Sequence, residues 1–200
     1  MNKPKTLFNL VAYVPPIAQF SNTVLVIIDA QNEYINGPIQ LPDVADATAK
    51  ANTLLNAARD AKCKVIHIVH RGSPDGIFSL TSHRGAIIDD LQPRDGEKVI
   101  EKTKPNAFAG TDLATELGAP GQSILFAGFM THMCVSSTVR AALDLGYPAT
   151  VAGDACATRD LPLVGGGVIS AVDLHAAELA GLADRFAAIA SVEEVLGAQA

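Results

Sequence analysis

Short apolar runs alternate along this chain with longer segments whose apolar residues recur at helical spacing. The apolar runs are rich in β-branched residues and predict six strands, at residues 23–29, 64–70, 98–102, 123–128, 148–154 and 186–191. Apolar residues three and four positions apart predict helices over residues 44–61, 110–119, 134–146, 168–183 and 192–198. Strands that alternate with helices indicate a doubly wound α/β fold, in which helices cover both faces of a mostly parallel sheet.

Two segments lie outside this alternation. Residues 71–97 are rich in Gly, Pro, Ser and Asp, which predicts a long irregular excursion of the kind that is often functional. Residues 1–22 are expected to form an N-terminal arm that packs on the domain or on a partner subunit, and residues 23–200 to form one domain. Asn9 and the Pro15-Pro16 pair interrupt the apolar start, and no A-x-A site follows, so a signal peptide is not expected.

Composition limits the class of protein further. The 200 residues are 48% hydrophobic and 18% charged, which is typical of a globular domain with a sizeable core. The net charge is −6 and there is no basic run, so we expect neither a nucleic-acid nor a membrane partner. The three cysteines are well separated and form no C-x-x-C pair, which favours a reducing, cytoplasmic location.

Candidate chemistry lies at the ends of predicted strands. In doubly wound sheets, sites form beyond the carboxyl ends of the strands, near a switch in strand order. Asp29, the turn at Gly128 and Asp154 are at such ends, and Lys104 lies just past the third strand. Cys134 begins the helical pattern that follows Gly128. We therefore expect these polar residues on one rim of the sheet.

Each of the three reactive side chains has two interpretations. Cys134 is either a core thiol or a nucleophile whose thiolate is favoured by the helix N-terminus and a nearby cation. Asp29 is either a turn or capping acid or a general base for that thiol. Lys104 is either a solvated surface residue or the cation that lowers the pKa of Cys134 and positions Asp29. A carboxylate, a lysine and a thiol at three strand ends form a coherent nucleophilic set.

Four segments resemble the isochorismatase-like cysteine hydrolases, in the same order along the chain. "IIDAQNEY" is similar to the family's D-x-Q-x-x-aromatic motif, and "KTKPNAFAGTDLATEL" to its lysine segment, K-x-x-x-A-F-x-x-T-x-L. "AGFMTHMCVSSTVRAALDLGY" resembles G-x-x-T-x-x-C-V with its helix, and "VAGDACAT" resembles D-A-x-x-[ST]. The resemblance implies a three-layer α/β/α, Rossmann-like domain with a catalytic triad of Asp29, Lys104 and Cys134. It also implies a cis peptide between Phe129 and Met130, with the amides of Met130 and Cys134 forming the oxyanion hole.

Four further residues are candidates for substrate binding. Gln31 and Tyr34 follow Asp29 and line a pocket, unless Gln31 instead bonds loop backbone. Phe108 forms either an apolar wall or part of the core. Arg84, in the long excursion, is either a bidentate ligand for a substrate carboxylate or a solvated surface residue.

A metal centre is not expected. Nicotinamidases of the same family carry a D-x-H-x₅-H motif, and this chain has no such spacing. His67 and His70 are three positions apart in a strand, so they point to opposite faces and are not a ligand pair. No cofactor is therefore predicted.

The sequence leads to one functional hypothesis and two rivals. We expect a cysteine amidohydrolase that cleaves a C–N bond of a small amide, carbamoyl or ureido compound through a thioester, in a homodimer or homotetramer. One rival is a non-catalytic binding or interaction protein on the same fold. The other is a thiol redox protein in which Cys156, at another strand end, resolves Cys134.

Overall fold

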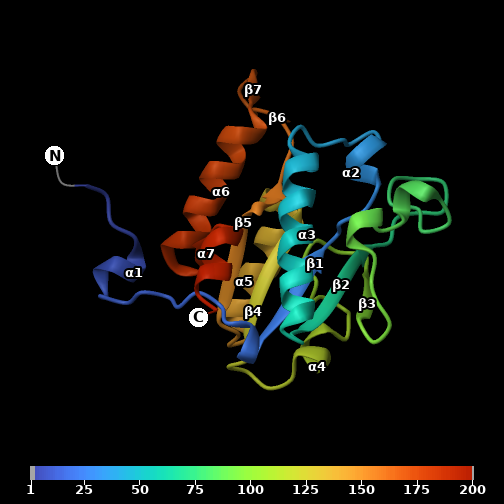
Figure 1. Cartoon of the computed structure of the whole chain (residues 1–200). Coiled ribbons are helices and arrows are strands. Elements are labelled where there is room, and N and C mark those ends of the chain that lie inside the picture. The colour runs from blue at the N-terminus through green and yellow to red at the C-terminus, as the bar shows by residue number, and fades with distance from the viewer. Residues whose placement is uncertain (1–2, 200) are drawn as a thin grey trace.

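The computed structural model describes residues 3–199 and contains one central parallel sheet (Figure 1). Six strands lie in the order β3-β2-β1-β4-β5-β8, and each neighbouring pair is parallel. Their bounds are β1 Thr23–Ile28, β2 Lys64–His70, β3 Lys98–Lys102, β4 Ser123–Phe129, β5 Ala149–Ala157 and β8 Ala188–Ala190. The predicted doubly wound α/β fold, with its six-stranded sheet, is confirmed.

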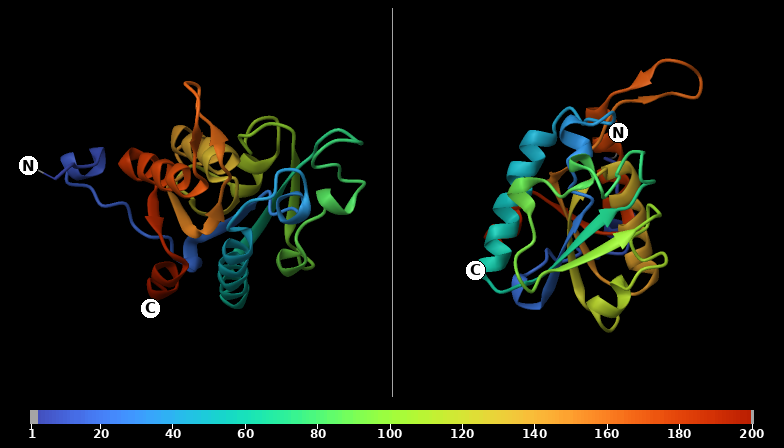
Figure 2. Two further views of the ribbon diagram at one scale, coloured as in Figure 1. Left: turned by 90° about the horizontal axis from the view of Figure 1, so that it is seen from above. Right: turned by 90° about the vertical axis from the view of Figure 1, so that its right-hand side faces the viewer.

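Helices cover both faces of the sheet, so the domain has three layers (Figure 2). On one face lie α2 (Glu33–Asn36), α3 (Val44–Asp60) and α7 (Val192–Gly197); on the other lie α4 (Leu113–Leu117), α5 (Ser136–Asp144) and α6 (Ala171–Arg185). Strand β1 is buried along its whole length, because its alternate residues enter the two cores. Leu25 and Ile27 pack on the α3 side, whereas Val26 and Ile28 pack on the α5 side.

The strand order places one crevice at the centre of the sheet. The chain runs outward from β1 to β2 and β3, and then returns to the other side of β1 as β4. The segments that follow β1 and β4 therefore leave the sheet side by side, at the switch point where doubly wound folds bind ligands. Asp29 follows β1, and the turn containing Cys134 follows β4.

One helix prediction and one strand prediction need correction. The expected helix over residues 168–183 begins only at Ala171, where the Ser170 side chain caps it by accepting from the Asp173 N–H. The residues before it form a small antiparallel hairpin of β6 (Leu161–Pro162) and β7 (Val168–Ile169), which projects from the body (Figure 2). The glycine-rich turn between them uses positive φ angles at two glycines, which explains the hairpin.

The other correction concerns Asp154. This residue was expected at a strand end, but β5 continues past it to Ala157 through an irregular register. Its carboxylate accepts a hydrogen bond from the Val192 N–H at 2.8 Å and lies 3.6 Å from Lys50 Nζ. Asp154 therefore ties β5 to α3 and α7, away from the crevice.

The irregular segments are arranged as follows. The excursion at residues 71–97 contains only the short 3₁₀ turns η2 (His83–Gly85) and η3 (Asp89–Leu91), as the sequence predicts. The arm carries α1 (Leu7–Leu10), whose first N–H donates to Asp184 Oδ1 of the α6 end at 2.8 Å, and a 3₁₀ turn η1 (Phe20–Asn22) leads into β1. Within residues 3–199, no helix combines the length and apolar character that crossing a bilayer requires.

Candidate active site

Asp29 is held at the end of β1 with its carboxylate fully buried. Its φ angle is 48°, and its N–H donates to the Ile68 carbonyl at 2.9 Å, so the chain turns sharply while staying attached to β2. Oδ2 lies 2.7 Å from Lys102 Nζ, and no side chain among residues 3–199 hydrogen-bonds to Oδ1. The carboxylate therefore has a strong partner on one oxygen only.

Cys134 lies in the turn that follows β4. Residues Thr131–Val135 form a single π-helical turn, η4, that leads into α5, and the thiol is 5% exposed. The Met130 carbonyl accepts from the N–H groups of Met133 and Val135, which folds the turn over the crevice. The peptide between Phe129 and Met130 is cis, as the family resemblance implies.

Glycine is required just before this turn. Gly128 has a φ angle of 115°, and a Cβ at this position would lie 2.1 Å from the Ile28 carbonyl oxygen. The close approach brings the end of β4 against the end of β1. Asp29 and Cys134 are thereby placed on the two sides of the crevice.

The lysine in the crevice is Lys102, so the prediction for Lys104 is wrong. Lys102 Nζ contacts Asp29 Oδ2 at 2.7 Å and Cys134 Sγ at 3.2 Å, whereas Lys104 is exposed. The end of the strand explains the difference: Lys102 is the last residue of β3 and shares its buried face with Ile100, whereas Lys104 lies in the loop beyond the strand. The motif spacing is no guide here, since the Ala-Phe pair begins three positions after Lys104 and five after Lys102.

His70 is a member of the site that the sequence did not reveal. Its Nδ1 lies 3.1 Å from Lys102 Nζ, because β2 and β3 pair with His70 opposite Lys102. The residue ends a strand on the same rim and shares a face with Ile66 and Ile68. That pattern could have singled it out, but the sequence reasoning treated it only as a metal ligand.

Burial dominates the protonation of the site. It raises the pKa of the Cys134 thiol to about 12; the Asp29 charge adds to this rise, and Lys102 offsets part of it. Burial also raises the pKa of Asp29, against the opposing effect of Lys102. Of the two interpretations of Cys134, the raised pKa favours a thiol that needs a base over a thiolate stabilised by the helix N-terminus, because desolvation outweighs the nearby cation.

One trio among the described residues could ligate a metal. Ligand atoms of Asp29, His70 and Cys134 all lie within 4.8 Å of one another. The Lys102 ammonium contacts all three, so it already supplies a positive charge where an ion would bind. His67 points to the opposite face of β2, as predicted, and bonds to Glu97.

Three of the four substrate-binding candidates have structural partners. Gln31 is fully buried, and its amide bonds the backbone of His70 and the Gly85 carbonyl, which favours the loop-bracing interpretation. Phe108 is half-buried, stacks on Tyr147 with ring centroids 5.8 Å apart, and packs against the core, which favours the core interpretation. Arg84 Nη1 lies 3.7 Å from Oε1 of the buried Glu33.

Tyr34 is buried between Phe78 and Phe129, with ring centroids 5.2 and 5.6 Å away. Burial and then the Asp29 charge raise the pKa of its phenol well above 10. Tyr34 is therefore a neutral side chain in the wall behind Asp29, rather than an exposed pocket residue.

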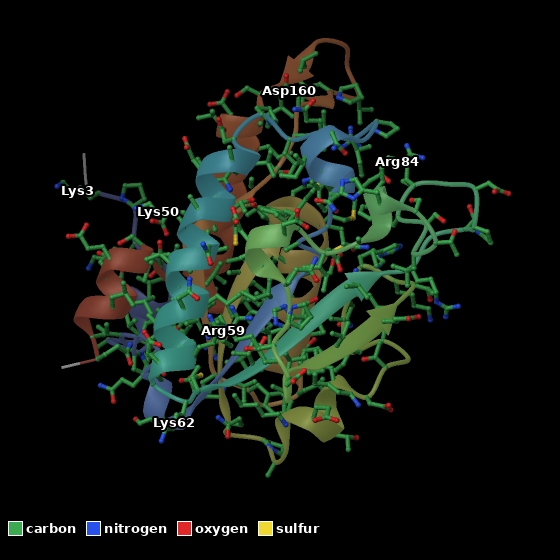
Figure 3. All side chains as sticks on the ribbon, turned by 45° about the vertical axis from the view of Figure 1, so that its right-hand side comes forward. Lys3, Lys50, Arg59, Lys62, Arg84 and Asp160 are labelled. Carbon is green, nitrogen blue, oxygen red and sulfur yellow. The ribbon has the colours of Figure 1, made fainter. Side chains whose placement is uncertain are left out.

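Arg159 is a rim residue that the sequence reasoning missed. It follows Thr158, whose hydroxyl contacts His132 Nδ1 in the turn of Cys134. Its Nε is buried, and no acceptor among residues 3–199 hydrogen-bonds to it. Burial lowers the pKa of His132 in that turn, and the charge of Arg159 lowers it further. Asp160, the residue after Arg159, is labelled in Figure 3 and lies at the same end of the molecule as Arg84.

The fold and this site define an α/β/α protein with a buried Asp–Lys–Cys constellation at the switch point. Residues 23–194 match the isochorismatase domain family, and the chain belongs to that family. The secreted isochorismatase effector Isc1 of Verticillium dahliae is 35% identical over 91% of this chain and 95% of its own length. The ureidoacrylate amidohydrolase RutB of Rhizobium rhizogenes is 29% identical over 68% of this chain and 70% of its own.

A solved structure extends the likeness to three dimensions. The isochorismatase from Pseudomonas putida KT2440 superposes with a TM-score of 0.90 at 42% identity, over 96% of this chain and 99% of that protein. Members of the family are hydrolases, including amidohydrolases, so the chain is an isochorismatase-family hydrolase.

Proposed function

We propose that this hydrolase cleaves a C–N bond of a small amide, carbamoyl or ureido compound, with Cys134 as the nucleophile. One observation carries the proposal: a fully buried ammonium, Lys102, contacts both a buried carboxylate and a buried thiol. Burying three such groups together costs stability, so their presence side by side at the switch point supports a chemical role.

The first step is a proton transfer from the Cys134 thiol to Asp29. The resting cluster holds a carboxylate, an ammonium and a neutral thiol, so its net charge is zero. After the transfer it holds a carboxylic acid, an ammonium and a thiolate, and its net charge is still zero. Burial raises the pKa of Asp29, which makes the carboxylate a stronger base, and this offsets part of the rise that burial causes in the pKa of the thiol.

The thiolate then attacks the substrate carbonyl. We assign the amides of Met130 and Cys134 to the oxyanion, since Met130 caps the turn η4 and Cys134 lies within it. Asp29 returns its proton to the departing amine or ammonia, which leaves a thioester on Cys134. A water molecule that gives its proton to Asp29 hydrolyses the thioester, and Lys102 stabilises the anionic states throughout.

Arg159 refines the substrate class. Its buried Nε has no hydrogen-bond partner among residues 3–199, its charge acts on His132 in the turn of Cys134, and an arginine fork matches a carboxylate. The name of the relative RutB describes an amidohydrolase of ureidoacrylate, a ureido acid. We therefore assign the carboxylate of a small acidic amide to Arg159, in place of Arg84, which already faces Glu33.

The rival functions have less support. Burial raises the pKa of both Cys134 and Cys156 to about 12, but among residues 3–199 only Cys134 has an ammonium within hydrogen-bond distance, which favours a nucleophile over a redox pair. A non-catalytic role would leave the buried charges of the crevice without a purpose. The homodimer or homotetramer, the small-molecule substrate as sole partner and the cytoplasmic location stay predictions.

The test is ammonia release from a panel of small amides that includes nicotinamide, maleamate, carbamoyl amino acids, ureido acids and biuret. We expect release by the wild type and none by Cys134→Ala. Cys63→Ala is the matched control, because Cys63 is buried at the opposite end of the sheet, beside Thr23. Equal rates for the wild type and Cys134→Ala would overturn the mechanism.

A further inference from the structure

Lys102 has a third partner beyond the two that the proposed chemistry uses. An ammonium group carries three N–H donors. An ion pair joins it to Asp29 Oδ2 at 2.7 Å, and its hydrogen-bond acceptors are His70 Nδ1 at 3.1 Å and Cys134 Sγ at 3.2 Å. The three contacts surround a side chain that is buried from solvent, so the orientation of the ammonium depends on all of them.

His70 is itself held firmly in place. Its backbone N–H donates to Gln31 Oε1 at 2.8 Å, and its carbonyl accepts from Gln31 Nε2 at 3.0 Å. The ring packs on Phe78, with centroids 5.2 Å apart. These contacts account for the full burial of Gln31, because Gln31 holds His70 in place and His70 contacts Lys102.

The imidazole that faces Lys102 is uncharged. Burial, and then the Lys102 charge, lower the pKa of His70 to about 4. Because Nδ1 accepts a hydrogen bond from the ammonium, the ring's own proton is on Nε2. The charged and titratable groups around the ring are Lys102 from β3, Asp29 from the end of β1 and Cys134 from η4. Because the imidazole is neutral, it adds no charge to the cluster of Asp29, Lys102 and Cys134, whose net charge stays at zero.

We propose that His70 is a positioning residue that accepts the third N–H of Lys102 and thereby aims the other two at Asp29 and Cys134. This inference rests on the proposed function only for its effect on turnover. Without an acceptor at this position, one N–H of a buried ammonium is unsatisfied, and the lysine moves to find another partner. That movement weakens its contact with sulfur, where the thiolate must form.

Three substitutions separate positioning from other roles. His70→Asn keeps an acceptor at the δ position, His70→Gln moves the acceptor one atom further out, and His70→Leu removes it with a similar shape. We expect kcat to fall about 10- to 100-fold in His70→Leu and His70→Gln, the range for a lost hydrogen bond to a charged group. KM should change less than about threefold, and His70→Asn should retain kcat within about threefold.

A second readout does not depend on knowing the substrate. The rate at which iodoacetamide alkylates Cys134, followed by peptide mass, reports how readily the thiolate forms. It should fall in His70→Leu and His70→Gln and stay near the wild-type rate in His70→Asn. If no amide on the panel is hydrolysed, the proposed function fails, but the alkylation series still decides the role of His70.

Two results would overturn the inference. A wild-type alkylation rate in His70→Leu would mean that Lys102 needs no third acceptor. Equal losses in His70→Asn and His70→Leu would mean that the imidazole does something an amide oxygen cannot, such as proton transfer. Circular dichroism checks folding, and if His70→Leu does not fold, the contrast between Asn and Gln decides the question.

Discussion

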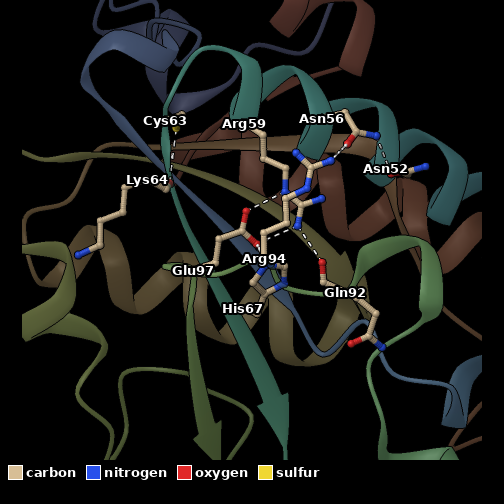
Figure 4. Close-up of polar contacts among 9 residues, drawn as sticks. All are labelled: Asn52, Asn56, Arg59, Cys63, Lys64, His67, Gln92, Arg94 and Glu97. Atoms are coloured by element: carbon tan, nitrogen blue, oxygen red, sulfur yellow. Dashed lines mark hydrogen bonds and ion pairs between the residues drawn. The ribbon is translucent and has the colours of Figure 1, made fainter.

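Strand β2 carries two histidines, His67 and His70, which lie on opposite faces of the sheet. Each is part of a cluster that contains a carboxylate and a cationic side chain. On the α5 face lies the Lys102 cluster, which consists of Asp29, His70, Lys102 and Cys134. On the α3 face lies the Arg59 cluster, in which Glu97 bonds His67 at 2.8 Å and Arg59 at 2.7 and 2.8 Å (Figure 4). The residue types are nearly the same, but the surroundings of the two carboxylates differ.

The difference lies in how completely each carboxylate is satisfied. Burial favours the protonated form of Glu97, but hydrogen bonds from Arg59, the Arg94 N–H and His67 outweigh it and lower its pKa to about 2. Asp29 has Lys102 as its ion-pair partner, and burial raises its pKa instead. A fully bonded carboxylate is chemically inert, whereas an under-bonded one is a base. The Arg59 cluster therefore holds the fold together, and the Lys102 cluster is suited to chemistry.

The largest effect should come from the two neighbouring lysines. Lys102→Met removes the cation beside the thiol, and we expect kcat to fall about 10²- to 10³-fold, as for a lost charge-stabilising group. Lys104→Met, two residues further on and exposed, is the matched control and should stay within about twofold. Steady-state ammonia release measures both. A loss in Lys104→Met equal to that in Lys102→Met would mean that the geometry of the resting crevice does not govern the reaction.

These two lysines also show how much of the site could be predicted from the sequence. Apolar periodicity predicted the sheet and the rim, because strand burial follows from residue type alone. Asp29 and Cys134 could be found because each follows a run of apolar residues. Lys102 was missed because the motif spacing fits neither lysine, and only the pairing of β3 with β2 shows which side is buried. The neutral state of Cys134 depends on packing density around the sulfur, which no local pattern encodes.

A change in the Arg59 cluster should affect stability and spare activity. Glu97→Gln leaves the guanidinium of Arg59, whose side chain is 9% exposed, without its counter-charge. We expect the free energy of unfolding to fall by about 2–3 kcal/mol, somewhat below the cost for a fully buried pair. Denaturant unfolding measures this loss, and kcat of the folded protein should change less than about twofold. An unchanged stability together with a large drop in kcat would remove the distinction between the two clusters.

The same carboxylate predicts a pH effect with a definite sign. The folded pKa of Glu97, about 2, lies below its ordinary value of 4.5. The unfolded chain therefore binds the proton first, so Glu97 stabilises the fold above pH 4.5, and this stabilisation is lost as pH falls from about 4.5 to 2. The wild type should lose about 2 kcal/mol more than Glu97→Gln between pH 6 and pH 3, in paired urea titrations. Parallel losses in the two proteins would show that Glu97 is not held in its charged form.

The smallest effect concerns the two arginines of the rim, which repeat the contrast between satisfied and unsatisfied groups. Arg84 faces the buried Glu33, whereas Arg159 Nε finds no hydrogen-bond partner in the part of the chain that the structure describes. Arg159→Ala should raise KM about tenfold for a ureido acid, the effect of losing one charge-assisted contact, and much less for the corresponding neutral amide. Arg84→Ala, the control, should leave both KM values within about twofold. If Arg84→Ala instead raised KM selectively for the ureido acid, Arg84 would be the residue that binds the substrate carboxylate. The substrate would then have to displace Glu33 from its ion pair with Arg84.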